Sequence, residues 1–263
     1  MNLEHLFEQY INDNRSKRIA AALQKKQQAA LQVKGLIGSQ TAWVVAAVNR
    51  LTNHPFLIIA SDKEEAAFLQ NDISALGAFS KEALFFPDSY RRPSGFDKLD
   101  RTNVLQRTET ISKLVAKPKA APIIVTYPEA IFEKVVAPSN LQKSAIEVQV
   151  GTELDVPFLV EILIEYGFVR VDFVYEPGQF SVRGGIVDIY SYGNEYPYRV
   201  DLFDVIVESI RTFDPTSQLS TKRIDHVTII PNVNTQFDAA QKVSIFEVLP
   251  ETTAVWVLSL IHI

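Results

Sequence analysis

The stretch Phe180–Ser220, FSVRGGIVDIYSYGNEYPYRVDLFDVIVESIRTFDPTSQLS, decides the fold of the second half of the chain. Its short runs are rich in β-branched and aromatic residues, which favour strands. An Arg-Gly-Gly turn at Arg183–Gly185 and a Gly-Asn turn at Gly193–Asn194 separate these runs. Apolar and charged residues alternate along Tyr198–Phe203, and side chains of a strand alternate between its faces. We therefore expect a compact β unit with one apolar core face and one charged face.

Strands alternate with helices in the first half of the chain. Phe56–Ala60, Ala83–Phe86 and Ile123–Thr126 are predicted strands, and helices are predicted between them. Ser61 and Glu64 have the spacing of a capping box that would open one of these helices. Such alternation is typical of a parallel α/β sheet.

Three segments follow from this pattern. We predict a parallel α/β domain over residues 1–142 and a smaller α+β domain over residues 143–222. Residues 223–257 are expected to return to the first domain through strands near Val227–Ile230 and Val255–Leu258. Within the smaller domain, Val169–Val174 is predicted to be a strand.

Composition excludes several classes of protein. At 263 residues, 47% hydrophobic and 22% charged, the chain is long enough for one large or two modest globular domains. No apolar run approaches the roughly 18–20 residues that span a bilayer, so we expect no membrane partner. The absence of cysteine fits a cytoplasmic protein, and the four scattered histidines predict no metal site. The net charge of −5 disfavours a plain nucleic-acid-binding module.

A glycine-containing segment lies where a phosphate-binding loop is expected, between a short predicted strand and a helix. A working loop reads GxxxxGK[ST], in which glycine backbone N–H groups surround the phosphates, the lysine reaches them and the hydroxyl binds Mg²⁺. From Gly35 the segment reads GLIGSQTA. The residues of this degenerate phosphate loop are Gly35, Gly38, Ser39, Gln40, Thr41 and Ala42.

Neither the lysine nor the metal ligand is present in this segment, because Thr41 and Ala42 occupy their positions. Two interpretations remain. The segment is a relic turn that joins a strand to a helix, or it binds nucleotide weakly through the helix N-terminus alone. We favour the relic, and therefore predict no catalytic residue, no metal and no cofactor in this part of the chain.

A basic stretch follows the predicted strand at Ala83–Phe86. It contains Arg91, Arg92, Lys98, Arg101 and Arg107. These residues either form a solvated loop and helix face or contact nucleic acid. We favour the solvated face.

Several strings resemble one family of repair proteins. The residues "FSVRGGIVDIY", "YPYRVDLFD" and "VESIRTFDP" closely resemble the second domain of bacterial transcription-repair coupling factors, a domain shared with the excinuclease protein UvrB. The strong resemblance covers Val169–Ser220, and the first domain resembles the family weakly. It implies a helicase-like first domain with a degenerate P-loop, followed by a domain like the UvrB interaction domain.

The resemblance also implies a function. In this family the second domain docks the excinuclease protein UvrA, which implies an adaptor that recruits UvrA where RNA polymerase has stalled. RNA polymerase, double-stranded DNA, ATP and Mg²⁺ would bind through an ATP-dependent DNA translocase farther along a longer protein. The alternative is an ATP-dependent damage-recognition protein like UvrB. That alternative requires an intact phosphate loop and a DNA-clamping aromatic hairpin, and the sequence FPDSYRRPSGFDKLDRTNVLQRTE lacks the hairpin.

The family's partner-binding arginines match Arg170 and Arg183, and Gly184 adjoins the second of them. Arginine suits such a surface because its planar group pairs bidentately with carboxylates. The competing interpretation is that both arginines pair with Asp172, Asp188 or Glu176 in their own sheet. The string "FRVRG" of UvrB has an arginine where this chain has Ser181, so the interface is not expected to be identical.

Five further side chains of the smaller domain are assigned from the sequence. We expect Phe203 and Phe213 to fill the core, and Glu195, Asp201 and Asp204 to be ordinary surface acids. The final residues 258–263, LSLIHI, are either a strand cut short or a sequencing artefact, and we favour the artefact.

Overall fold

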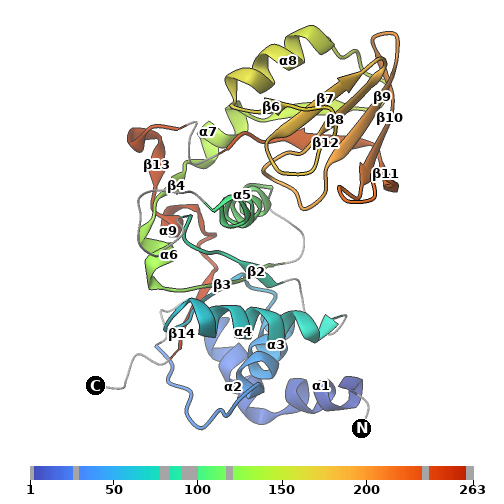
Figure 1. The fold of residues 1–263 in the computed structure, drawn as a ribbon. Coiled ribbons are helices and arrows are strands. Elements are labelled where there is room, and N and C mark those ends of the chain that lie inside the picture. Colours follow the sequence, from blue (N-terminus) through green and yellow to red (C-terminus); the bar gives the residue numbers. More distant parts are fainter. Residues whose placement is uncertain are drawn as a thin grey trace. The chain divides into compact units, whose positions relative to one another are not determined.

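The computed structural model describes residues 3–25, 30–77, 83–89, 100–116, 121–232 and 237–258. The chain forms two compact units (Figure 1). The first consists of residues 1–87, 116–133 and 249–263, and the second of residues 88–115 and 134–248.

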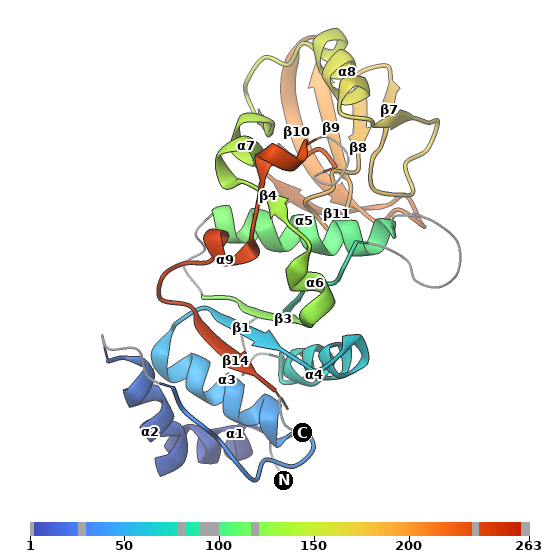
Figure 2. The ribbon, with the colours of Figure 1, turned by 90° about the vertical axis from the view of Figure 1, so that its left-hand side faces the viewer.

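The first unit is built on a parallel sheet. Its strands are β1 (Phe56–Ile59), β2 (Ala83–Phe85), β3 (Ile123–Thr126) and β14 (Ala254–Val257), in the order β14-β1-β3-β2. All three neighbouring pairs are parallel. Figure 2 shows β14 beside β1, although they lie far apart in the sequence. The expected return of the chain to this sheet near Val255–Leu258 is therefore present.

Five helices of the first unit are described. They are α1 (Leu3–Asn12), α2 (Asn14–Leu23), α3 (Gln40–Thr52), α4 (Lys63–Ala75) and α6 (Pro128–Phe132). The α4 helix begins one residue later than the expected capping box implied. Asp62 is its N-cap and accepts from Glu65 N at 2.8 Å, while the Glu65 carboxylate accepts from Ser61 N at 2.8 Å. The first bond satisfies a backbone donor that the helix start leaves unpaired, and the second fixes the residue before the N-cap.

The second unit contains a six-stranded sheet of order β11-β10-β9-β8-β7-β6. Its neighbouring strands are antiparallel except β6 and β7, which are parallel. The strands are β6 (Val169–Arg170), β7 (Gln179–Arg183), β8 (Ile186–Ile189), β9 (Tyr198–Phe203), β10 (Ile206–Phe213) and β11 (Ser220–Ile224).

The second unit also contains smaller elements. They are α5 (Arg101–Val115), β4 (Val135–Val136), α7 (Pro138–Lys143), β5 (Ile146–Gln149), α8 (Val156–Glu165), β12 (His226–Ile229), η2 (Ala239–Gln241), β13 (Lys242–Val243) and α9 (Ile245–Val248). The strand expected near Val227–Ile230 does not return to the first unit. It is β12, which pairs antiparallel with β5 and is thus held in the second unit.

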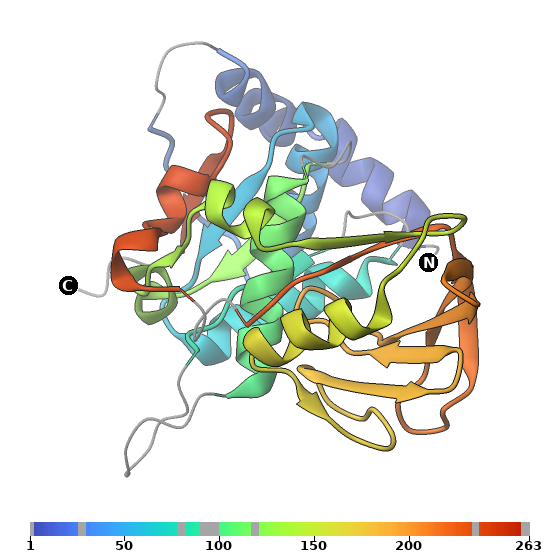
Figure 3. The same ribbon diagram turned by 90° about the horizontal axis from the view of Figure 1, so that it is seen from above.

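One face of the six-stranded sheet carries the core of the second unit, and α8 packs on that face (Figures 1 and 3). Leu159 and Leu163 of α8 lie in one buried cluster with Phe180, Val187 and Val200 of the strands. The Asp155 carboxylate caps α8 by accepting from Phe158 N at 3.0 Å. The alternation seen in the sequence is therefore the alternation of a core face and an outer face.

Two expected features of the outer face differ in the structure. The predicted strand Val169–Val174 ends at Arg170, because the chain then crosses the outer face and buries Val174 against Tyr190 and Phe213. Phe213 is buried as expected, but Phe203 at the end of β9 is 77% exposed, so the prediction that it fills the core is wrong.

Neighbouring positions of α8 provide a stability test. Leu163 is fully buried and Ile164 is 58% exposed. We expect Leu163→Ala to lower the free energy of unfolding of the second unit by about 2–5 kcal/mol, since it leaves a cavity in the core. The matched change Ile164→Ala is expected to alter it by less than about 0.5 kcal/mol. Urea denaturation followed by circular dichroism measures both, and equal losses would contradict this description of α8.

Candidate functional site

The glycine-containing segment enters α3 without a strand before it. Residues 30–37 form neither helix nor strand, so the expected short strand is not present. Gly35 and Gly38 have φ angles of 83° and 55°, in the left-handed region that glycine tolerates best. Ser39 is the N-cap of α3 but makes no side-chain capping bond. The segment is thus a glycine turn at the start of a helix.

The side chains of this turn do not supply the chemistry of a phosphate loop. The Gln40 side-chain oxygen accepts from Ile37 N at 3.0 Å, so that backbone donor is already occupied. Ala42 is buried and carries no hydroxyl, and Thr41 is partly buried.

Two cavities border the turn. One, of about 310 Å³, is lined by α1 and α2 and includes Arg15, Lys34 and Gly35. The Arg15 guanidinium donates to the Asp13 carboxylate at 2.8 and 3.0 Å, and this pairing lowers the pKa of Asp13 to about 2. The other cavity, of about 360 Å³, is lined by Thr41, Glu65 and β14 among others. In the described part of the chain, no group of three or more metal-ligating side chains comes together.

The turn between β7 and β8 adjoins Arg183, the second of the two arginines expected to bind a partner. Gly184 is exposed and has a φ of 57°. A Cβ on Gly185 would lie 2.8 Å from the Leu202 backbone oxygen, closer than real contacts allow. Leu202 N also donates to the Gly185 oxygen at 2.7 Å. Glycine is therefore required where the turn approaches β9, as the Arg-Gly-Gly pattern predicts.

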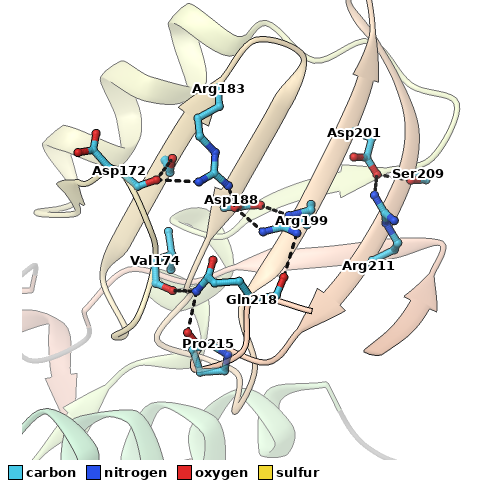
Figure 4. Close-up of polar contacts among 11 residues, drawn as sticks. Asp172, Val174, Arg183, Asp188, Arg199, Asp201, Ser209, Arg211, Pro215 and Gln218 are labelled. Carbon is cyan, nitrogen blue, oxygen red and sulfur yellow. Dashed lines mark hydrogen bonds and ion pairs between the residues drawn. The ribbon is translucent and has the colours of Figure 1, made fainter. Parts of the chain in front are cut away.

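Asp188 is the centre of a charged cluster on the outer face of the sheet (Figure 4). Its carboxylate is fully buried. It accepts from Arg183 at 2.6 Å and from two nitrogens of Arg199 at 2.8 and 2.9 Å. The hydrogen bond to Asp188 raises the pKa of Arg199, which also lies 4.5 Å from the centre of the Phe213 ring. Two guanidinium groups share one carboxylate, so the cluster keeps one positive charge.

Arg183 is held in place but remains partly accessible. Beyond its bond to Asp188, it donates to the Asp172 backbone oxygen at 2.8 Å and lies 4.9 Å from the centre of the Phe173 ring. Its side chain is 36% exposed, and Phe173 is 51% exposed. The competing interpretation is therefore correct in that Arg183 pairs with Asp188. Only two of the five guanidinium donors have a partner among the described residues, and the others are left for a further acceptor.

Arg170 lies apart from this cluster. It is in the edge strand β6, where its register partner is Phe180 of β7. Its side chain is exposed and makes no hydrogen bond or ion pair with any residue that the structure describes. The pairing of Arg170 with an acid of its own sheet, which the competing interpretation requires, is thus not seen among the described residues. No hydrogen bond or ion pair within the described ranges joins Arg170 to the partners of Arg183.

Two charged residues that were expected to be solvated have partners in the structure. Arg107 is buried at 1% exposure and has partners, so its inclusion in a solvated basic face is wrong. Asp201 is not an ordinary surface acid, because it pairs with Arg211 at 2.6 Å and accepts from Ser209. Arg91, Arg92 and Lys98 lie outside the described residues, as do positions 259–263 of the final hexapeptide.

The competing interpretation named Asp188 as a partner of Arg183, but its burial and its pairing with Arg199 were not predicted. One signal was available, since Asp188 interrupts the apolar run Ile186–Ile189. A carboxylate in such a run has to be paired if it is buried. The register supplies its partner, because Asp188 lies directly opposite Arg199.

Comparison with known proteins identifies this β unit. Residues 146–234 match the family described as the UvrB interaction domain. The chain is 32% identical to the transcription-repair-coupling factor of Bacillus subtilis (strain 168) over 198 residues, which are 75% of this chain and 16% of that protein. It is 26% identical to the factor of Escherichia coli (strain K12) over 196 residues, 74% of this chain and 17% of that protein. The chain therefore spans about a sixth of the length of these relatives.

The buried cluster gives a second stability test. We expect Asp188→Ala to lower the free energy of unfolding by about 3–5 kcal/mol, because it leaves the Arg199 side chain, which is only 16% exposed, without its carboxylate. Asp172→Asn is the matched control. Asp172 is exposed and only its backbone oxygen takes part in the cluster, so its change is expected to stay below about 0.5 kcal/mol. Chemical denaturation compares the two variants. An Asp188→Ala protein as stable as the control would contradict the stabilising role of this cluster.

Proposed function

We propose that the chain is the part of a transcription-repair-coupling factor that recruits the excinuclease protein UvrA, because residues 146–234 match the UvrB interaction domain family and the chain is similar to such factors. In this proposal it acts in transcription-coupled repair, in the cytoplasm, as a protein-binding adaptor without turnover of its own. The chain contributes a docking surface on its second unit.

The observation that carries the proposal is the positive charge left over at the Arg183–Asp188–Arg199 cluster. Arg183 presents unused donors next to the exposed Phe173 ring, and a planar guanidinium pairs well with a carboxylate of a partner. An arginine flanked by an aromatic ring is typical of the residues that dominate binding energy in protein interfaces. Gly184, exposed in the neighbouring turn, and Arg170, exposed on the edge strand β6, are the other proposed contacts; Arg170 lies opposite the core-face residue Phe180 and therefore reaches a partner around the sheet edge.

The first unit plays a structural part in this proposal. We interpret the turn from Gly35 to Ala42 as a degenerate phosphate loop of a helicase-like sheet. The occupied Ile37 N–H and the missing lysine and hydroxyl support this interpretation. ATP and Mg²⁺, together with RNA polymerase and double-stranded DNA, would then be bound by the remainder of a longer factor, an ATP-dependent DNA translocase. The alternative, an ATP-dependent damage-recognition protein like UvrB, requires a nucleotide site in this chain.

Arg170 provides a clean test of docking. We expect Arg170→Glu to weaken binding of purified UvrA by about 2 kcal/mol or more, roughly 30-fold, since it reverses the charge of an exposed contact without breaking a bond in the fold. Lys143→Glu, an equal charge change at the end of α7, is expected to bind normally. Surface plasmon resonance measures both. Arg183→Ala adds a variant that leaves Asp188 paired with Arg199, and undiminished binding by both arginine variants would refute the site.

Nucleotide binding is tested separately. We expect isothermal titration of the chain with Mg-ATP to show no micromolar binding, because neither Thr41 nor Ala42 can replace the lysine and metal ligand of a working loop. Micromolar affinity would contradict the degenerate-loop interpretation and favour the alternative. It would leave the docking proposal for the second unit untouched.

A further inference from the structure

Three arginines lie in one row across the outer face of the six-stranded sheet. The register places Arg199 of β9 opposite Arg211 of β10, and Arg211 opposite Arg223 of β11. Directly opposed residues of antiparallel strands point to the same face. We call Arg199, Arg211 and Arg223 the arginine row. Asp188 continues it on the other side of Arg199 (Figure 4).

The row is only partly neutralised. Asp188 pairs with Arg199, and Asp201 pairs with one terminal nitrogen of Arg211 at 2.6 Å. The Arg211 side chain is 39% exposed, and its Nε is buried without a partner among the described residues. Arg223 is exposed, and its side chain makes no hydrogen bond or ion pair with any residue that the structure describes. With Arg183 included, four guanidinium groups face two carboxylates, so two positive charges are left over.

Such a row is unfavourable for folding by itself. Like charges directly opposite each other destabilise a sheet, and edge strands commonly carry a charged side chain, especially lysine, that prevents association. The edge strand β11 already has Lys222 for that purpose. The row therefore presents more positive charge than the fold requires, on the face that also holds Arg183.

We propose that the arginine row extends the docking surface beyond Arg170 and Arg183, and that it receives an acidic, carboxylate-bearing surface of the partner. This inference rests on the proposed function, because the partner is taken to be UvrA. It assigns Arg211 and Arg223 as contacts and the partly buried Arg199 as the residue that positions Arg183 through Asp188.

The spacing fits carboxylates on a protein better than a nucleic-acid backbone. Neighbouring strands lie about 4.7–4.9 Å apart, close to the roughly 5.4 Å between successive turns of a helix. Acidic residues on successive turns would therefore meet successive arginines. Asp188 and Asp201 stand among the arginines, and these fixed carboxylates would repel a continuous run of phosphates. The net charge of −5 likewise disfavours nucleic acid.

The edge strand offers a matched pair of variants. Arg223 and Lys222 are adjacent, exposed and of equal charge, but they point to opposite faces of the sheet. We expect Arg223→Glu to weaken binding of UvrA roughly tenfold and Lys222→Glu to leave it within about twofold, when both are measured by surface plasmon resonance. The difference is expected to shrink as salt is raised, since exposed charges are screened.

The outcomes separate this inference from the proposed function. Failure of the unchanged chain to bind UvrA overturns the proposed function and this inference with it. If the unchanged chain binds, Arg170→Glu weakens binding, and Arg223→Glu behaves like Lys222→Glu, the row is not a contact and only this inference falls. A DNA duplex is tested by fluorescence anisotropy alongside. If Arg223→Glu reduces DNA binding but not UvrA binding, the row is a phosphate-binding surface and the proposal is overturned.

Discussion

The second unit depends on a buried carboxylate that is shared by two arginines. Asp188 has no exposed surface and satisfies its charge through Arg183 and Arg199 on the neighbouring strands. An unpaired charge at this depth would cost several kcal/mol, so β7, β8 and β9 are constrained to the register that brings these groups together. The same constraint holds Arg183 beside the Phe173 ring. Stability of the sheet and the geometry of the candidate site therefore have one physical origin.

Much of the architecture follows from sequence patterns. The parallel sheet, the antiparallel unit and the Arg-Gly-Gly turn all occur where composition and alternation predict them, because these features depend on local spacing. The outer face was predicted less well. The chain after Arg170 leaves the sheet to cover Phe213, which is a contact between distant segments that a local pattern does not contain. Phe203 remains exposed because the alternation along β9 places it on the outer face with Arg199 and Asp201, so its apolar character alone gave the wrong prediction.

For the candidate site, likewise, the sequence indicated residues but not their surroundings. Arg170 and Arg183 were expected from a resemblance, whereas their surroundings required coordinates: one is exposed without a described partner and the other is paired. Arg107 has the same charge and lies buried in a helix. Composition gives the number of charges, but burial and register decide which of them face a partner. Asp188 was detectable in principle, since it interrupts an apolar strand, and its partner became evident only from the pairing of β8 with β9.

The position of β14 has a consequence for synthesis of the protein. This strand completes the edge of the parallel sheet next to β1, yet it follows β3 by a long segment that includes most of the second unit. A ribosome adds about 5–20 residues per second, so making residues 127–253 takes roughly 6–25 seconds. During that interval the backbone donors and acceptors on one side of β1 lack their final partner. An emerging chain with such an open edge can pair with strands of other chains until β14 is made.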